Sequence, residues 1–120
     1  MRTRRSATIL ALAILSGGCA SVPPPRAEIG KAEAALSSAR KERAGTYAPL
    51  SLHRAQAKLD GAKSAVRGER NERALRLAQQ AQLDAELAEL EAERERTRQS
   101  AAELERTVQA LREEIDDAVD

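Results

Sequence analysis

Two side chains stand out as groups that could do chemistry: the thiol of Cys19 and the imidazole of His53, each the only one of its type. A thiolate or an imidazole becomes catalytic when a partner side chain activates or orients it. His53 has no Cys, Ser or carboxylate partner to orient it, so we expect it at the solvent-exposed edge of a helix. One Cys and one His also exclude a disulfide framework and a four-ligand zinc site within the chain. The sequence therefore predicts no enzyme, no catalytic residue, no metal and no cofactor.

The composition favours helices over a bulky core. Charged residues make up 32% of the chain, Phe and Trp are absent, and Tyr47 is the only aromatic residue. Such a composition is typical of long helices and coiled coils. From Cys19 onward, 17 Lys and Arg face 19 Asp and Glu, a formal charge of −2. With its charges interspersed, the chain shows no basic footprint for nucleic acid, and we expect no small-molecule substrate.

Residues 1–18 have the three parts of a secretory signal peptide. Arg2, Arg4 and Arg5 form a basic start, and an apolar run over residues 7–15 follows. That run is too short to cross a membrane, which takes about 20 residues, and it leads into small residues. We therefore expect the protein to be exported and residues 1–18 to be removed.

The exit of this segment resembles the lipobox of bacterial lipoproteins, although Ser16 stands where that motif usually has Leu. The motif consists of Leu15, Ser16, Gly17 and Gly18, followed by Cys19. The resemblance implies an acylated Cys19, which would attach the chain to the outer membrane on its periplasmic side. An ordinary signal peptide that leaves Cys19 as a free thiol is the alternative. Residues 19–26 would then be a spacer, extended by three consecutive prolines.

Two short helices are predicted after the spacer, over residues 27–44 and 48–67. Their apolar faces are Ile29, Ala32, Leu36 and Ala39 in the first and Leu52, Ala55, Leu59, Ala62 and Val66 in the second. Gly45 and Gly68 are predicted to end them, and Gly61 to mark a close approach between helices. Pro49 suits the first position of the second helix, and Tyr47 in the turn is expected to cover the end of a small core.

A third helix is predicted from Asn71 to Val119, because this stretch contains neither Gly nor Pro and consists mostly of strong helix formers. Asn71 is the expected N-cap. Two stripes are expected to pack against neighbours: Ala74, Ala78, Ala81, Ala85, Ala88 and Ala92, and beside them Leu83, Leu87 and Leu90. The predicted fold is all-α: residues 27–92 form an antiparallel three-helix unit, two short helices packed on the first half of one long helix.

Residues 93–120 are expected to extend beyond this unit, since the short helices cannot cover so long a helix. The leucine spacing continues through Arg94 and Thr97 into an apolar seam, predicted to contact a partner as a coiled coil: Leu104, Val108, Leu111 and Ile115. The alternating charges of residues 93–98 are expected to form a solvated face rather than a recognition patch. A separate helix starting at Ser100, which with Glu103 fits a capping box, remains an alternative.

Several segments resemble the bacterial family called domain of unknown function 4398. They are YAPLSL at residues 47–52, RAQAKL at 54–59, Gly68, RALRLA at 73–78, Ala81 and DAELA at 84–88. The resemblance covers roughly residues 27–100 and implies a short exported lipoprotein of helical fold. It implies no known activity. Asn71 stands near a place where members often have an aromatic residue.

The function expected from these features is that of a structural or adaptor lipoprotein in the cell envelope. Its partner would be another envelope protein or a second copy of the chain. The alternative is a periplasmic module that binds a peptide or cell-wall ligand in a groove like that of tetratricopeptide helices. Stability that depends on protein concentration would favour the first function, and stability that depends on a ligand would favour the second.

Overall fold

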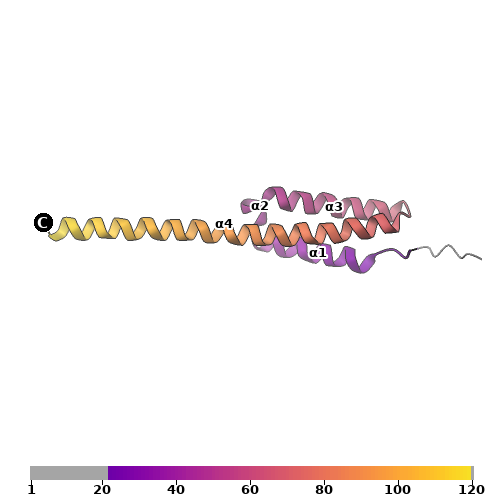
Figure 1. Cartoon of the computed structure of the whole chain (residues 1–120), viewed down its shortest axis with the longest axis horizontal. Helices are drawn as coiled ribbons and strands as arrows, with labels where there is room; N and C mark the ends of the chain where they lie inside the picture. Colours follow the sequence, from indigo (N-terminus) through magenta and orange to yellow (C-terminus); the bar gives the residue numbers. More distant parts are fainter. Residues whose placement is uncertain (1–21, 120) are drawn as a thin grey trace, which may run out of the picture.

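Helices account for nearly all of the chain that this computed structural model describes, residues 22–119. They are α1 (Arg26–Lys41), α2 (Ala44–Tyr47), α3 (Pro49–Arg67) and α4 (Asn71–Val119), with no strand in this range. Figure 1 shows α1 and α3 side by side with the first part of α4, which then continues alone. The predicted fold class is therefore confirmed: an antiparallel three-helix unit is extended by the rest of one long helix.

The long helix is unbroken. α4 contains 49 residues, which corresponds to a length of about 73 Å at a rise of about 1.5 Å per residue. The alternative start at Ser100 does not occur, because no Gly or Pro nearby interrupts the backbone hydrogen bonds between successive turns. The helix can therefore act as a straight rod.

Glycines do not take the left-handed positions at the two main turns, contrary to the expectation for Gly45. Gly45 lies within α2, and the left-handed residues are Arg43 (φ 63°) and Glu69 (φ 56°). After α3, Gly68 is the C-cap, with φ −93°. The Glu69 N–H then donates to the Val66 carbonyl (3.0 Å) and the Arg70 N–H to the Ala65 carbonyl (2.9 Å). These two bonds define a Schellman motif, in which Glu69 holds the position that usually favours glycine.

We expect Glu69→Gly to raise the free energy of unfolding by up to about 1 kcal/mol, because glycine adopts a left-handed conformation without steric cost. Urea unfolding followed by circular dichroism measures this change. Glu86→Gly is the control, since a glycine at this exposed site inside α4 should lower stability by about 1 kcal/mol. A loss of stability in both variants would contradict the assignment.

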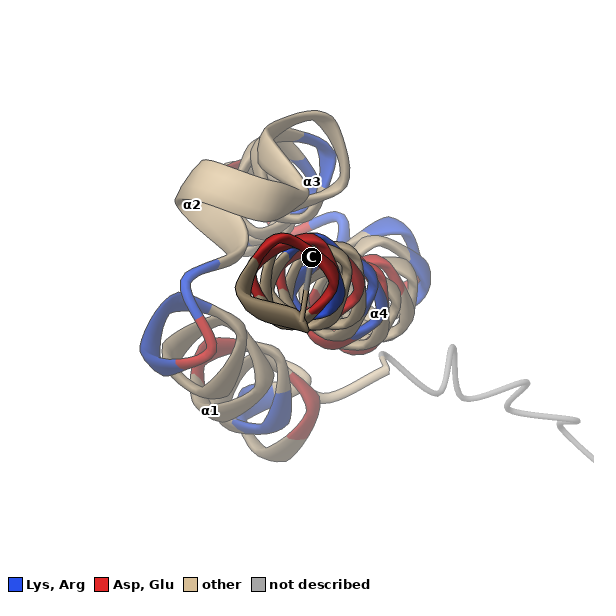
Figure 2. Ribbon diagram, turned by 90° about the vertical axis from the view of Figure 1, so that its left-hand side faces the viewer, with Lys and Arg blue, Asp and Glu red and all other residues tan. Residues whose placement is uncertain are grey.

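The core is built mainly from alanine. All six residues of the alanine stripe of α4 are fully buried. Four of them cluster with the short helices: Ala81 and Ala85 with Ala32 and Leu36 of α1 and with Ala55 and Leu59 of α3, and Ala88 and Ala92 with Ala39 of α1. Figure 2 shows α1 and α3 on different sides of α4. Since alanine projects only a methyl group, both neighbouring helices approach α4 closely along one stripe.

The buried face of α3 differs from the predicted one at its ends. Ser51 and Ala65 are buried, whereas Leu52 and Val66 are half-buried at the edge. The small side chains lie on the line of closest contact, and the Ser51 hydroxyl donates to a Glu91 carboxylate oxygen across the interface (2.5 Å). Gly61 does not mark a required close approach, because an added Cβ would meet only the tip of Leu77, at 3.4 Å.

Candidate interaction surface

The leucine stripe of α4 is not packed against the other helices. Leu83, Leu87 and Leu90 are 63%, 42% and 62% exposed, so the prediction that Leu83 and Leu87 pack against a neighbouring helix was wrong. At about 100° per residue these leucines lie on nearly the opposite side of α4 from the alanines. Because α1 and α3 both pack against the alanine stripe, no helix of the three-helix unit covers the leucines.

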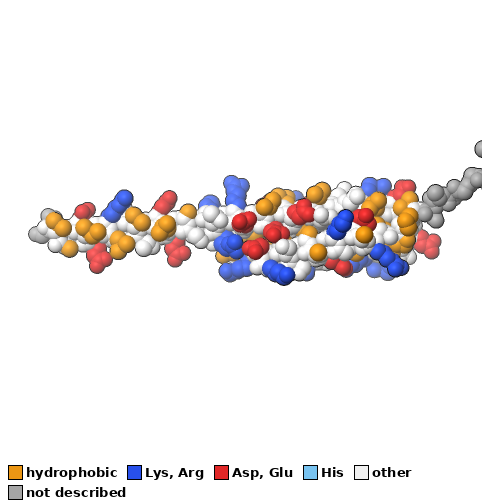
Figure 3. Space-filling model, turned by 90° about the horizontal axis from the view of Figure 1, so that it is seen from below, with side chains coloured by type: hydrophobic (Ala, Val, Ile, Leu, Met, Phe, Trp, Pro, Cys, Tyr) orange, Lys and Arg blue, Asp and Glu red, His pale blue; other side chains and the backbone are white. Residues whose placement is uncertain are grey.

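A second group of large apolar side chains is exposed farther along α4. Leu104, Val108, Leu111 and Ile115 are between 40% and 64% exposed, and Ala92 is the last buried residue of α4. Figure 3 shows apolar side chains along this uncovered part of the helix.

The two groups share one register, with steps of four and three residues that pass through Arg94, Thr97 and Ala101. We call the seven large apolar residues the seam: Leu83, Leu87, Leu90, Leu104, Val108, Leu111 and Ile115. The seam spans about 48 Å of α4 at about 1.5 Å per residue.

Polar and aromatic contacts lie at the point along α4 where the shorter helices stop packing against it. Glu42, just after α1, pairs with Arg96 at 2.9 Å. Tyr47 packs against the core cluster that includes Ala88 and Ala92, and the Arg43 guanidinium lies 5.3 Å from the centre of its ring. Beyond this point the contacts are local to α4. Hydrogen bonds from Arg98 and then Gln99 lower the pKa of the Glu95 carboxyl group.

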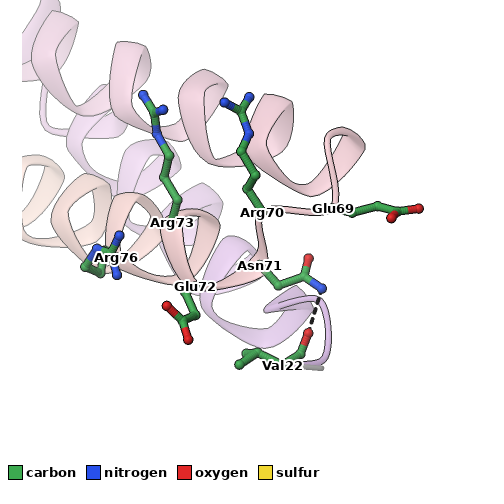
Figure 4. A pocket seen from close by; sticks show the side chains of 7 residues that line it. All are labelled: Val22, Glu69, Arg70, Asn71, Glu72, Arg73 and Arg76. Atoms are coloured by element: carbon green, nitrogen blue, oxygen red, sulfur yellow. Dashed lines mark hydrogen bonds between the residues drawn. The ribbon is translucent and has the colours of Figure 1, made fainter. Parts of the chain in front are cut away.

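At the opposite end of the molecule, residues 22–25, the described part of the spacer, lie next to the start of α4. The Asn71 side-chain amide donates to the Val22 carbonyl at 2.6 Å (Figure 4). Asn71 is thus the first residue of α4 and not its N-cap, and its side chain holds the spacer. An open groove of about 470 Å³ adjoins this contact. It is lined by Val22, Glu69, Arg70, Asn71, Glu72, Arg73 and Arg76.

The remaining predicted residues fall into three groups. Cys19 and the lipobox residues Leu15, Ser16, Gly17 and Gly18 lie outside the described residues. Leu59, Ala74, Ala78 and Ala81 are buried, and Leu52 packs against both clusters of the core. Pro49 is the first residue of α3, and His53 is exposed on that helix.

Residues 22–119 hold neither a cluster of metal ligands nor a membrane-spanning helix. No three His, Cys, Asp or Glu side chains in this range lie together as a set that could hold a metal ion. None of the four helices is both long enough and apolar enough to cross a membrane.

A comparison with known proteins gives one match. A family model described as Domain of unknown function (DUF4398) matches residues 27–104. Searches of curated proteins and of solved structures returned no match. The matched range includes α1 to α3 and the part of α4 that extends to Leu104.

Proposed function

The chain belongs to the family described as Domain of unknown function (DUF4398), and we propose that it is a lipid-anchored structural or adaptor protein of the bacterial outer membrane, facing the periplasm. The observation that carries the proposal is the seam, a line of large apolar side chains left exposed along a rigid helix. Exposed apolar surface arranged in this way is typical of sites that bind another protein.

The proposed anchor is an acylated Cys19, produced after removal of the signal peptide over residues 1–18. The lipobox-like sequence before Cys19 supports this step. Burial of acyl chains contributes about 0.8 kcal/mol per CH₂ group, so the three chains of a bacterial lipoprotein would hold the protein permanently.

The anchor also gives the seam a direction. Only two residues separate Val22 from Cys19, so the distance between them is at most about 11 Å, three residue steps along an extended chain. Because Asn71 binds the Val22 carbonyl, the start of α4 would lie near the membrane. The uncovered part of α4 would then extend away from the membrane and present its apolar side chains up to about 70 Å into the periplasm.

We expect Cys19→Ser to abolish palmitate labelling and to move the protein out of the outer-membrane fraction, because serine offers no thiol for the lipid. Metabolic labelling and density-gradient fractionation of the full chain in a bacterial host measure both effects. Ser16→Leu is the matched control, since it restores the usual lipobox residue and should keep full labelling. Equal labelling of the parent and Cys19→Ser would contradict the anchor.

The adaptor role has its own test in the same cells. Chemical cross-linking of envelopes should yield a cross-linked species with the parent, and much less of it with the double variant Leu104→Glu/Leu111→Glu. Both substitutions lie beyond the last buried residue of α4, so the three-helix unit should stay folded. Unchanged cross-linking would count against the seam as the contact surface.

A second candidate function is the binding of an anionic cell-wall peptide at the spacer end. The groove there carries Arg70, Arg73 and Arg76, and arginine pairs well with carboxylates. Figure 4 shows the Arg70 and Arg73 side chains pointing the same way. This function predicts that soluble peptidoglycan fragments raise the melting temperature at a fixed protein concentration, and that Arg70→Gln/Arg73→Gln removes the increase.

A further inference from the structure

We infer that the seam is covered by a second copy of this chain, aligned parallel and in register as a two-stranded coiled coil. The inference rests on the proposed anchor for the direction of the two chains. It goes beyond the proposed function because it specifies the partner and the geometry of the contact.

The residue types along the seam favour two strands. Its steps of four and three residues place Leu87, Val108 and Ile115 at heptad position a and Leu83, Leu90, Leu104 and Leu111 at position d. In the distal half, β-branched residues thus occupy a and leucines occupy d. This combination favours parallel dimers over trimers or tetramers.

Arg94 and its neighbours give the contact a register. Arg94 stands at an a position, where a single polar residue selects register and oligomeric state at some cost in stability. In the parallel arrangement Glu93 at position g of one chain lies beside Arg98 at position e of the other, a pair of opposite charges. One heptad earlier the corresponding residues, Glu86 and Glu91, carry like charges, and there the Glu91 carboxylate accepts a hydrogen bond from Ser51 of α3.

The three-helix units leave room for this contact. α1 and α3 pack against the alanine stripe on the opposite side of α4, so in a dimer both units would lie outside the paired α4 helices (Figure 2). An antiparallel pair would also join apolar residues, with Leu104 facing Ile115. It would place the two spacers at opposite ends of the dimer, however, and two anchors in one membrane surface favour the same end. Attachment to one surface also raises the effective concentration of the chains.

The test uses single cysteines in the full-length protein in outer-membrane vesicles, oxidised with copper phenanthroline and separated on non-reducing gels. Leu104→Cys and Ile115→Cys should each form disulfide-linked dimers alone, because a parallel register brings identical residues together. Glu113→Cys, at the outer f position, is the matched control and should stay at background. The inference is overturned if only a mixture of Leu104→Cys and Ile115→Cys forms dimers, which indicates antiparallel chains, or if none form.

The unsubstituted parent chain distinguishes a failure of the proposed anchor from a failure of the proposed dimer. An acylated Cys19 cannot be oxidised, so the parent should give no dimer band. If the parent cross-links through a free Cys19 and leaves the membrane fraction, the anchor fails. Even in that case, dimer bands of Leu104→Cys and Ile115→Cys that are stronger than the dimer band of the parent still report on the dimer.

Sedimentation equilibrium of the detergent-solubilised full chain gives a second readout. The parent should show the mass of two chains, and Leu104→Glu/Leu111→Glu should raise the dissociation constant by about 100-fold or more, because two carboxylates per chain would be buried without partners. A parent that stays at the mass of one chain at all concentrations also overturns the inference.

Discussion

Leu36→Ala is expected to lower the free energy of unfolding by about 2–5 kcal/mol. Leu36 is the largest hydrophobic side chain that is fully buried, and most of its partners in the core are alanines. Because an alanine side chain has no alternative rotamers, these neighbours cannot turn into the cavity that Leu36→Ala leaves. Since small domains are stable by only about 5–15 kcal/mol, this one change should leave the three-helix unit close to unfolding.

Leu50→Ala is the matched control for Leu36→Ala. Leu50 lies on α3 and is 68% exposed, so the same deletion should change stability by less than about 0.5 kcal/mol. Urea unfolding of both variants, followed by circular dichroism, measures the difference. Equal effects would show that the core does not centre on Leu36.

The second prediction applies one substitution, Ala→Leu, at two places in α4 and expects opposite results. Ala85 is fully buried between α1 and α3, so Ala85→Leu should overpack the core and cost about 1–3 kcal/mol or more. Ala101 is exposed and continues the register of the seam. Ala101→Leu should therefore leave the three-helix unit unaffected and strengthen the proposed dimer by about tenfold, through the added apolar area.

Thermal unfolding and sedimentation equilibrium measure the two effects separately. Ala85→Leu should lower the melting temperature, and Ala101→Leu should lower the dissociation constant. If Ala101→Leu weakened association, it would show that Ala101 faces away from the contact, and the seam would not be continuous.

The sequence alone determined the helices of this protein. The absence of Gly and Pro from Asn71 to Val119 predicted the full extent of α4, because nothing in that stretch interrupts backbone hydrogen bonding. The length difference between α4 and the short helices predicted its uncovered end. These features depend on local backbone preferences and on helix geometry, and both can be deduced from the residue types and the number of residues in each helix.

The tertiary structure decided which stripe of α4 is buried. The alanine and leucine stripes have the same spacing, so periodicity could not distinguish them, and hydrophobicity alone favoured the burial of both. α1 and α3 bury the alanines because close approach of three helices requires small side chains along the contact. Leu83 and Leu87 are left exposed as a result, and the seam is longer than the one predicted.

Tertiary contacts also decided the positions of single residues. Ser51 is buried in place of Leu52 because it lies on the line of contact and reaches Glu91. Glu69, not Gly68, takes the left-handed turn between α3 and α4. The bond from Asn71 to Val22 fixes the spacer at one end of α4. Each of these depends on residues far apart in the sequence or on the path of the chain between helices, and local spacing does not encode either.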